Sequence, residues 1–344
     1  MIKTALVGYG FSAKTFHLPF LTTSADYAVT AVSSSQGDKV RTALPGARLY
    51  ATPEAMIEDC DAGLVVITAP NNVHYELATL ALSHDKDVLL EKPFVTQSAH
   101  GQALIELAER RQRLLCVYHN RRWDGDFLTV RQLVDTNQVG RVRYFRSHID
   151  RFRPAIQVRW REQPGEGTGM LYDLGPHLID QMLQLFGLPQ SVTGHCRTLR
   201  AGAQVDDFFH VICHYPELLV ELHASPFNAG PKIRYELQGD TGHYVKFDLD
   251  PQEDRLRAGC LPDHPDWSKS APAQYGTLYT ETGATSVPTL TGGYQHFFAQ
   301  LADAIRQRGQ PPVAPEDALQ GIRLIEQIWE SSRTGRTVGM LDYA

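Results

Sequence analysis

Residues 2–13, which read IKTALVGYGFSA, decide the fold of this chain. The run at 2–7 is apolar enough for a buried strand and meets Gly8 at once, before a helical pattern begins. The pattern G-x-G-x-x-A follows. Its first glycine permits a tight turn, its second lets the backbone approach a pyrophosphate, and its small last residue allows close helix–strand packing. A helix N-terminus would add free N–H groups and the positive end of its dipole. The stretch predicts a dinucleotide site made by Gly8, Gly10, Phe11, Ser12 and Ala13.

Strand and helix signals continue to alternate up to about residue 121. Continuous apolar runs, typical of strands buried on both faces of a parallel sheet, are separated by helical patterns. The predicted strands are 27–32, 64–68, 87–90 and 114–118, and the predicted helices are 74–83 and 97–111. The order predicts a Rossmann domain over residues 1–121, with a doubly wound parallel sheet. A purely structural glycine turn is the alternative, which these further units disfavour.

The regular alternation of predicted strands and helices ends after residue 121. Helical patterns at 125–135 and 176–186 enclose a strand at 143–149, and strand after strand follows between 191 and 247. Loops with a hairpin near 282–283 lead into two amphipathic helices, at 294–308 and 315–331. Residues 122–344 are therefore predicted to form an α+β domain with a large, mostly antiparallel sheet. We expect this domain to bind substrate and to carry the oligomer contacts.

The composition excludes several classes of protein. The 344 residues carry a net charge of -6 and no basic stripe, which argues against a nucleic-acid partner. No apolar run is long enough to span a membrane, and the N-terminal run meets glycine too early for a signal peptide. The five cysteines are scattered, as expected for reduced thiols in a cytoplasmic protein.

The end of the second predicted strand bears on the choice of dinucleotide. NAD sites usually carry an acidic residue there, for the ribose hydroxyls. Here Ser33 and Ser34 stand at that place, with Lys39 and Arg41 close behind, and hydroxyls with cations suit the 2′-phosphate of NADP. Asp38 keeps NAD open as an alternative.

Two more loops should lie at the carboxyl edge of the sheet, where ligands bind in such folds. Thr68, Pro70 and Asn71 form one of them and are predicted to contact the ribose or nicotinamide, while His74 reads as the start of a helix. Glu91 and Lys92 end another strand, in the sequence Glu-Lys-Pro, and are also predicted to contact the cofactor. A lysine at a sheet edge loses solvation unless it has a partner.

In the second domain, Asp173 and His177 stand four residues apart around a predicted helix start, so both can face one cleft. Oxidation of a secondary alcohol needs a base, and histidine, with an unperturbed pKa of about 6.5, suits that task near neutrality. Lys92 could stabilise alkoxide charge, and Asp173 could orient His177 or bind a substrate hydroxyl. The structural alternatives are helix capping by His177 and an N-cap role for Asp173.

These motifs together resemble the glucose–fructose oxidoreductase/inositol dehydrogenase (Gfo/Idh/MocA) family over essentially the whole chain. The stretches 118–128 and 172–177 are similar to the branch that includes NADP-dependent scyllo-inositol 2-dehydrogenase. The resemblance implies a nicotinamide-dependent oxidoreductase, in which Lys92, Asp173 and His177 match the family's active-site lysine, aspartate and histidine. It also implies a homodimer or higher homo-oligomer. Two departures are Ala13 in place of the third glycine and the missing acid after the second strand.

Further candidates for substrate contact are Asn120, Arg122 and Tyr172, beside Asp173 and His177, and Arg153 is a weaker one. For Asn120 and Arg122 the alternative is packing or an interdomain contact. We expect no metal site, because the histidines lack paired ligand spacing and no cysteine lies near His177 in the sequence.

The predicted function is hydride transfer between NADP, or NAD, and a secondary alcohol or ketone of a small polyhydroxylated substrate, with a scyllo-inositol-like cyclitol favoured. One alternative within the same class is an aldose or keto-sugar reductase. Two others from different classes are a protein that senses NADP(H) without turnover and a plain binding protein. The set of Lys92, Asp173 and His177 argues against a sensor, which needs no proton acceptor.

Overall fold

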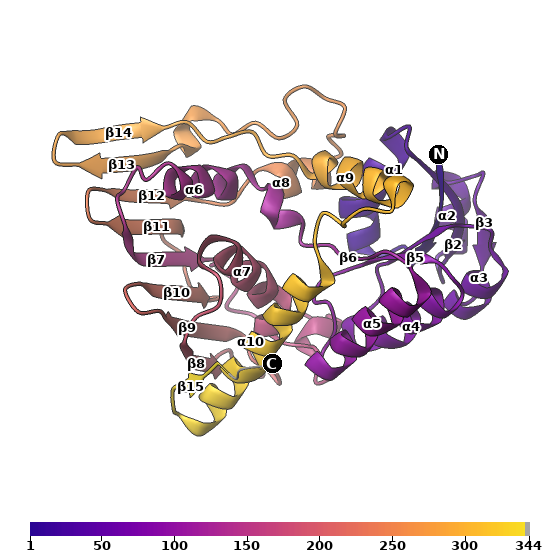
Figure 1. Ribbon diagram of the computed structural model, residues 1–344, viewed down its shortest axis with the longest axis horizontal. Helices are drawn as coiled ribbons and strands as arrows, with labels where there is room; N and C mark the ends of the chain where they lie inside the picture. The colour runs from indigo at the N-terminus through magenta and orange to yellow at the C-terminus, as the bar shows by residue number, and fades with distance from the viewer. Residues whose placement is uncertain (341–344) are drawn as a thin grey trace. The chain divides into compact units, whose positions relative to one another are not determined.

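The computed structural model describes residues 1–340, which pack into two compact units (Figure 1). The first unit contains Met1–Asn120, Gln252–Ser268 and Gly293–Gln320. The second contains Arg121–Pro251, Lys269–Gly292 and residues 321–340. Packing therefore gathers into the first unit two segments that lie far beyond residue 121 in the sequence.

A six-stranded parallel sheet forms the centre of the first unit, in the order β3-β2-β1-β4-β5-β6. Its strands are β1 (Ile2–Val7), β2 (Tyr27–Ser33), β3 (Arg48–Tyr50), β4 (Leu64–Ile67), β5 (Asp87–Leu90) and β6 (Leu115–Val117). The connecting helices are α1 (Leu18–Thr23), α2 (Gly37–Ala43), α3 (Pro53–Asp59), α4 (His74–Ser83) and α5 (Ser98–Arg111). Every residue of β4 and β5 is buried, as expected for strands covered on both faces. The strand order reverses between β1 and β4, so the predicted Rossmann fold is confirmed, with its switch point there.

Aromatic packing holds the later segments in the first unit. These segments supply α8 (Gln252–Arg257), α9 (Tyr294–Gln307) and the start of α10 (Pro315–Thr334). The ring of Phe298 on α9 stacks on Phe20 of α1, with centroids 4.9 Å apart. The hydroxyl of Tyr27 on β2 donates to the Phe298 carbonyl oxygen at 2.6 Å. Burying these large aromatic rings stabilises the fold several times more than a surface contact would. The helix α9 therefore packs against α1 and β2.

The second unit is built on a nine-stranded sheet, in the order β14-β13-β12-β11-β7-β10-β9-β8-β15 (Figure 1). Its strands are β7 (Val142–His148), β8 (Ser191–Arg197), β9 (Phe208–His214), β10 (Leu219–Ala224), β11 (Ile233–Gly239), β12 (His243–Phe247), β13 (Gly276–Thr280), β14 (Gly283–Val287) and β15 (Val338–Gly339). Only the β7–β10 pair is parallel among the described strands of this sheet, so the predicted mostly antiparallel sheet is confirmed.

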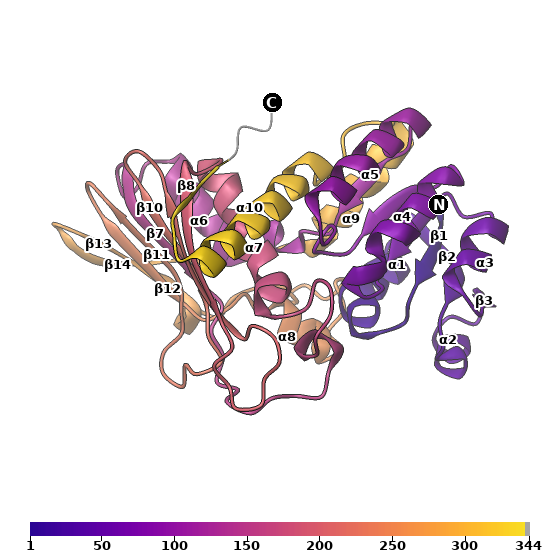
Figure 2. The same cartoon turned by 90° about the horizontal axis from the view of Figure 1, so that it is seen from below.

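One face of this sheet is covered by helices (Figure 2). The helices α6 (Gly125–Asp135) and α7 (Met170–Phe186) belong to this unit, and α7 packs against β9 and β10. Burial alternates strictly along β9, so one side of β9 faces the helices and the other does not. Among residues 1–340, no helix combines the length and apolar character needed to cross a membrane.

The helix α7 begins at Met170, six residues before the start at 176 that the sequence predicts. Its first turn is held by Asp206, which lies just before β9. The Asp206 carboxylate accepts from the Leu171 N–H at 2.7 Å, and the Asp206 carbonyl accepts from the Met170 N–H at 2.8 Å. Gly169 precedes the helix with φ of 91°, and a Cβ there would lie 1.7 Å from Asp206 Oδ1. A capping partner so distant in sequence leaves no local signal.

Candidate functional site

The glycine turn of the first unit has the geometry that a dinucleotide requires. Gly8 has φ of 88°, its N–H donates to the Ser33 carbonyl at 2.9 Å, and a Cβ at Gly8 would lie 2.9 Å from Thr68 Oγ1. A side chain at Gly8 is therefore excluded both by conformation and by space. Among residues 1–340, no atom other than those of Gly10 and its chain neighbours lies within 4 Å of where a Cβ at Gly10 would stand, so the backbone there is open to a ligand. Ala13 is fully buried, as the packing role of a small residue predicts.

Three of the predicted cofactor residues come from the loop after β4. The hydroxyl of Thr68 donates to the Val7 carbonyl at 2.7 Å, which ties the ends of the two central strands together. Pro70 is exposed, while Asn71 is buried at the start of a short turn, Asn71–Val73. These residues lie at the carboxyl edge of the sheet, where such folds bind ligands.

His74 has a structural role. Its ring nitrogens lie 2.9 Å from the Pro93 carbonyl and 3.0 Å from the Ala69 carbonyl, so it joins the loops after β4 and β5 at the start of α4. Burial lowers the pKa of His74, which favours the neutral ring.

The side chain of Glu91 contacts residues of the glycine turn and of the helical turn that follows it. Its Oε1 accepts a hydrogen bond from the Ser12 hydroxyl and lies 2.8 Å from His17 Nε2, while its Oε2 accepts from the Lys92 N–H at 3.0 Å. Burial opposes the charge of Glu91, but the His17, Ser12 and Lys92 interactions outweigh it and lower the pKa of Glu91 to about 2. The predicted cofactor residue is thus a buried carboxylate that fixes the start of the Lys92 segment. Lys92 itself is half-buried, and the Lys92–Pro93 peptide is cis.

His17 is a site residue that the sequence did not reveal. It lies in the π-helical turn Ala13–His17 and is fully buried. Its distance of 74 positions from Glu91 leaves no pattern to find.

The end of β2 offers hydroxyls and cations, as predicted. Ser33 is buried, and the Ser34 hydroxyl accepts from the Gln36 N–H at 3.0 Å. Asp38, the residue that kept NAD open, pairs with Arg41 across 2.8 Å, and both side chains are exposed. The residues of this turn and the open backbone at Gly10 fit the phosphates of a nicotinamide dinucleotide.

In the second unit, Asp173 and His177 lie one turn apart on α7. His177 is buried inside the helix, so it does not cap it, and Asp173 is half-buried in the first turn, where Gly169 holds the N-cap position. Arg161 Nε lies 3.2 Å from Asp173 Oδ1. The Arg161 guanidinium also lies over the Trp160 ring at 4.5 Å, and the Arg161 carbonyl accepts from the Gly169 N–H at 2.9 Å. The short turn Trp160–Glu162 therefore positions the Asp173 carboxylate.

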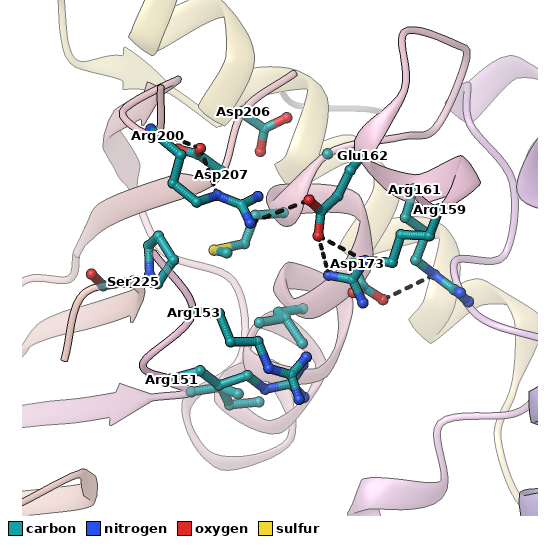
Figure 3. Close-up of a pocket in the computed structure, with 15 residues that line it drawn as sticks. Arg151, Arg153, Arg159, Arg161, Glu162, Asp173, Arg200, Asp206, Asp207 and Ser225 are labelled. Atoms are coloured by element: carbon teal, nitrogen blue, oxygen red, sulfur yellow. Dashed lines mark hydrogen bonds and ion pairs between the residues drawn. The ribbon is translucent and has the colours of Figure 1, made fainter. Parts of the chain in front are cut away.

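A pocket opens beside Asp173, and we call it the arginine pocket (Figure 3). It lies between α7 and the segments that follow β7 and β8. Its lining residues are Ile149, Arg151, Arg153, Arg159, Arg161, Glu162, Gly169, Met170, Asp173, Leu174, Arg200, Asp206, Asp207, Ser225 and Pro226. The pocket brings together Asp173 and Arg153, two of the substrate candidates of the sequence.

The remaining substrate candidates have mixed surroundings. Arg122 binds Asp180 through Nε at 2.9 Å and Nη2 at 2.6 Å, and both side chains are buried. This bidentate pair agrees with the packing interpretation of Arg122. Asn120 is buried in the first unit, at the start of the turn Asn120–Trp123. Tyr172 is half-buried, and burial raises its pKa to about 12. Substrate contact by these three residues stays a prediction.

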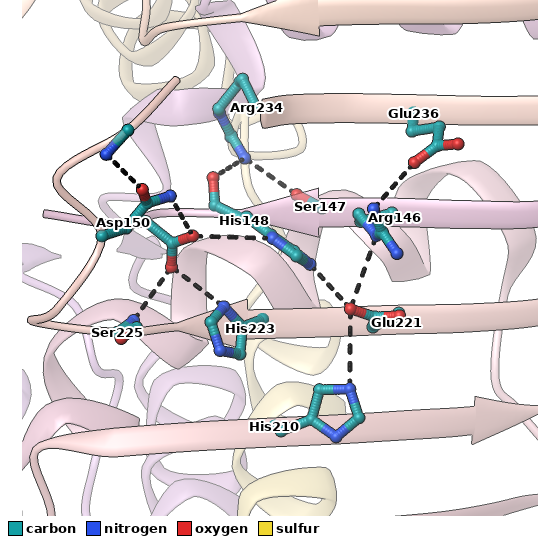
Figure 4. A network of polar contacts seen from close by, with 12 residues as sticks. Arg146, Ser147, His148, Asp150, His210, Glu221, His223, Ser225, Arg234 and Glu236 are labelled. Carbon is teal, nitrogen blue, oxygen red and sulfur yellow. Dashed lines mark hydrogen bonds and ion pairs between the residues drawn. The ribbon is translucent and has the colours of Figure 1, made fainter. Parts of the chain in front are cut away.

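The face of the large sheet opposite α7 carries a polar network (Figure 4). His148, Asp150 and His223 form a group whose possible metal-ligand atoms lie within 4.8 Å of one another. Asp150 lies 2.9 Å from His223 and 3.7 Å from His148, and Glu221 lies 3.0 Å from His148. Sequence spacing did not reveal this group, because the histidines come from two strands paired in register. Each of these histidines lies within 4.0 Å of a carboxylate, so this face carries charged and polar groups rather than apolar ones.

A Rossmann unit with this glycine turn, joined to an α+β unit that carries an aspartate–histidine pair, defines a nicotinamide-dependent oxidoreductase. Family comparison agrees. Residues 2–119 match the "Oxidoreductase family, NAD-binding Rossmann fold" and residues 131–340 match the "Oxidoreductase family, C-terminal alpha/beta domain". The chain belongs to the Gfo/Idh/MocA oxidoreductase family, as its motifs predicted.

Several known proteins match this chain over nearly its full length. The uncharacterized oxidoreductase YdgJ of Escherichia coli is 40% identical, with 98% of both chains covered. The scyllo-inositol 2-dehydrogenase (NADP(+)) IolW of Bacillus subtilis is 35% identical, with 99% of this chain and 96% of IolW covered. Among solved structures, the one titled "Structure of putative oxidoreductase yvaA from Bacillus subtilis in triclinic form" has a TM-score of 0.95 at 34% identity and covers 99% of this chain and 98% of its own. The structure titled "Crystal structure of a putative oxidoreductase from Klebsiella pneumoniae" has a TM-score of 0.93 at 41% identity and covers 100% of this chain and 97% of its own.

Proposed function

We propose that this oxidoreductase transfers a hydride between NADP and a secondary alcohol or ketone of a cyclitol or sugar. The observation that carries the proposal is the Asp173–His177 pair on α7, of which Asp173 lines the arginine pocket, in a chain whose other unit carries a dinucleotide turn. The full-length similarity to an NADP-dependent scyllo-inositol 2-dehydrogenase favours a scyllo-inositol-like substrate.

Three residues of the chain have separate roles in alcohol oxidation. Bound NADP supplies the acceptor of the hydride. His177 takes the hydroxyl proton while the C–H bond breaks and its electron pair leaves the carbon, so that the C–O bond becomes a carbonyl. The ammonium of Lys92 stabilises the negative charge that develops on the oxygen. Asp173, held by Arg161, binds a substrate hydroxyl or orients His177.

Cofactor choice follows from the end of β2. Ser33 and Ser34 place no carboxylate beside the ribose position, and the one nearby acid, Asp38, is paired with Arg41. A 2′-phosphate therefore meets hydroxyls and the cations of Lys39 and Arg41 instead of a repelling charge. NAD is the alternative cofactor.

The same residues serve the reverse reaction, in which His177 returns a proton and an aldose or keto-sugar is reduced. Reduction of such a sugar is the second candidate. A protein that only senses NADP(H) would need neither a proton acceptor at His177 nor charge stabilisation by Lys92.

The test is the absorbance of reduced nicotinamide, followed with purified protein, NADP or NAD, and a panel of inositol isomers, aldoses and polyols. Turnover of a cyclitol or sugar with a preference for NADP is the expected result. Binding of NADP without turnover of any panel member, in either direction, would overturn the enzymatic proposal in favour of a sensor.

We also propose that the protein forms a homo-oligomer through the open face of the nine-stranded sheet, the face that carries His148 and Glu221 (Figure 4). Light scattering on the full chain tests this, and a monomer mass at micromolar concentration would contradict it. A charged face predicts that the association weakens with salt.

A further inference from the structure

The arginine pocket carries more positive than negative charge in an acidic protein. Five arginines and four carboxyl groups line it, whereas the whole chain has a net charge of -6. A neutral polyol would make no use of this excess, so the pairing of each charged group matters.

Three of the arginines have carboxylate partners inside the pocket. Arg161 lies 3.2 Å from Asp173. Arg159 and Arg200 share Glu162, at 2.6 Å and 3.2 Å, and Arg200 also lies 2.9 Å from Asp207. These pairs use three of the four carboxylates of the pocket, and Figure 3 shows them gathered on the side of Glu162.

The fourth carboxyl group, Asp206, is committed to the start of α7. It accepts from the Leu171 N–H at 2.7 Å and lies apart from the guanidinium groups of Arg151 and Arg153 in Figure 3. Burial raises the pKa of Asp206 to about 7, so near neutrality it carries only part of a negative charge.

Arg153 is left with its charge uncompensated. Within residues 1–340, its guanidinium forms no ion pair or hydrogen bond, although its backbone N–H is fixed to the Pro226 carbonyl at 2.7 Å. The side chain is half-buried and extends with Arg151 toward the same part of the pocket, on the side of Asp173 (Figure 3). A half-buried guanidinium, whose planar fork matches carboxylate and phosphate oxygens, is a ready receptor for an anion.

We propose that the arginine pocket binds an anionic group of the substrate, a carboxylate or a phosphate, with Arg153 as its main ligand. The inference rests on the proposed function and narrows its substrate class to acidic cyclitols and sugars, such as sugar acids or polyol phosphates. The anion would lie on the Arg153 side of the pocket, and Asp173 on the neighbouring helix would meet a hydroxyl of the same molecule.

Matched substrate pairs test this proposal. The kcat/KM is compared for glucose, glucuronate and glucose 6-phosphate, and for myo-inositol and an inositol monophosphate, at constant ionic strength. We expect one acidic member to be preferred over its neutral partner at least about 10-fold, and Arg153→Gln to lower that preference about 10- to 100-fold, the effect of one charge-assisted contact. A preference for glucuronate would identify a carboxylate as the bound anion, and a preference for glucose 6-phosphate or the inositol monophosphate would identify a phosphate. Arg153→Lys should retain part of the preference.

The matched control is Arg333→Gln, since Arg333 is an exposed arginine of α10 paired with Glu330. It should leave the preference as in the wild type. Equal kcat/KM for acidic and neutral substrates, or a preference for the acidic substrate that Arg153→Gln does not change, would overturn the anion site. The proposed function would still stand in that case if the enzyme turned over a neutral polyol.

Binding of inorganic phosphate gives a readout that needs no turnover. Calorimetric titration of the full chain should show binding that Arg153→Gln weakens at least about 10-fold and Arg333→Gln does not. If no panel member is turned over but this difference is found, the enzymatic proposal fails and the anion site stands. Identical phosphate binding by wild type and Arg153→Gln would overturn the anion site.

Discussion

Arg161 Nε lies 3.2 Å from the Oδ1 of Asp173, so a residue of a short turn holds the carboxylate that the sequence predicts for the active site. The turn is itself fixed to the start of α7, because the Arg161 carbonyl accepts from the Gly169 N–H. The direction of the Asp173 side chain is thus set from outside its own helix.

Replacing Arg161 with Gln should lower kcat about 10-fold, because the Asp173 carboxylate loses the partner that orients it. The KM for NADP should stay unchanged, and Arg161→Lys should recover part of the rate. Both side chains are partly exposed, at 32% and 20%, so the melting temperature should move little. Steady-state kinetics beside a thermal melt check this. A kcat that falls only in step with the folded fraction would contradict a positioning role.

His177→Ala should lower kcat about 10²- to 10⁴-fold, since it removes the proposed proton acceptor. NADP binding, followed by quenching of tryptophan fluorescence, should be retained, because the dinucleotide turn lies in the other unit. The matched control is His195→Ala, which removes an exposed histidine of β8 and should keep the rate. Near-normal turnover by His177→Ala at saturating substrate would disprove its assignment as the base.

Lys92→Ala should lower kcat by a comparable factor, about 10²- to 10³-fold, through loss of charge stabilisation at the reacting oxygen. Glu91, which binds the Lys92 N–H, remains in place in this variant, so the turn should keep its geometry. Rapid-quench or stopped-flow measurement of the hydride step separates this effect from product release. An unchanged hydride step would remove Lys92 from the chemistry.

Ser34→Asp should reverse part of the NADP preference. The new carboxylate would repel a 2′-phosphate and accept from a ribose hydroxyl, so the ratio of kcat/KM for NADP over NAD should fall about 10- to 100-fold. The control is Thr42→Asp, which adds the same charge at an exposed position of α2 and should change the ratio little. If the ratio of kcat/KM for NADP over NAD were as low in the wild type as in Ser34→Asp, the wild-type protein would not prefer NADP and the proposed cofactor choice would be wrong.

Glu91→Gln should lower the free energy of unfolding at pH 7, because it removes the carboxylate charge from the buried contact with His17. The folded pKa of Glu91, about 2, lies below its ordinary value of 4.5. The stability that its charge contributes is therefore present above pH 5 and is lost as the pH falls toward 2. Urea unfolding should show the gap between wild type and variant narrowing by about 2 kcal/mol between pH 7 and pH 3. A gap that is constant with pH would contradict the lowered pKa.

Asp206→Asn should have the opposite pH dependence. Burial raises the folded pKa of Asp206 to about 7, above its ordinary 3.8, so the neutral acid favours the folded state and its contribution is lost as the pH rises through 7. The amide cannot ionise but can still accept from the Leu171 N–H. The variant should gain about 3 kcal/mol relative to the wild type between pH 5 and pH 8, measured by urea unfolding. Asp263→Asn, at an exposed carboxylate, should show no such gain.

Local patterns predicted the frame of the first unit well. The helix expected at 74–83 is α4 with the same bounds, and the strand expected at 87–90 is β5. The glycine turn also has the expected geometry, because the motif requires a tight turn at Gly8 and Gly8 has a φ of 88°. In contrast, the start of α7 was predicted six residues late, because the capping group at Asp206 lies more than thirty positions away and periodicity cannot detect it.

What the sequence determined by itself is the family, the Rossmann and α+β architecture, and the residue types available for chemistry. These depend on short-range periodicity and on motifs within a dozen residues, which hold wherever the chain folds. Only the tertiary structure decided which charges meet: Glu91 with His17, Arg161 with Asp173, and Arg153 with none of the carboxylates of its pocket. Such pairings depend on the approach of segments distant in sequence, and a Coulomb interaction changes severalfold with distance and burial, so no local pattern encodes it.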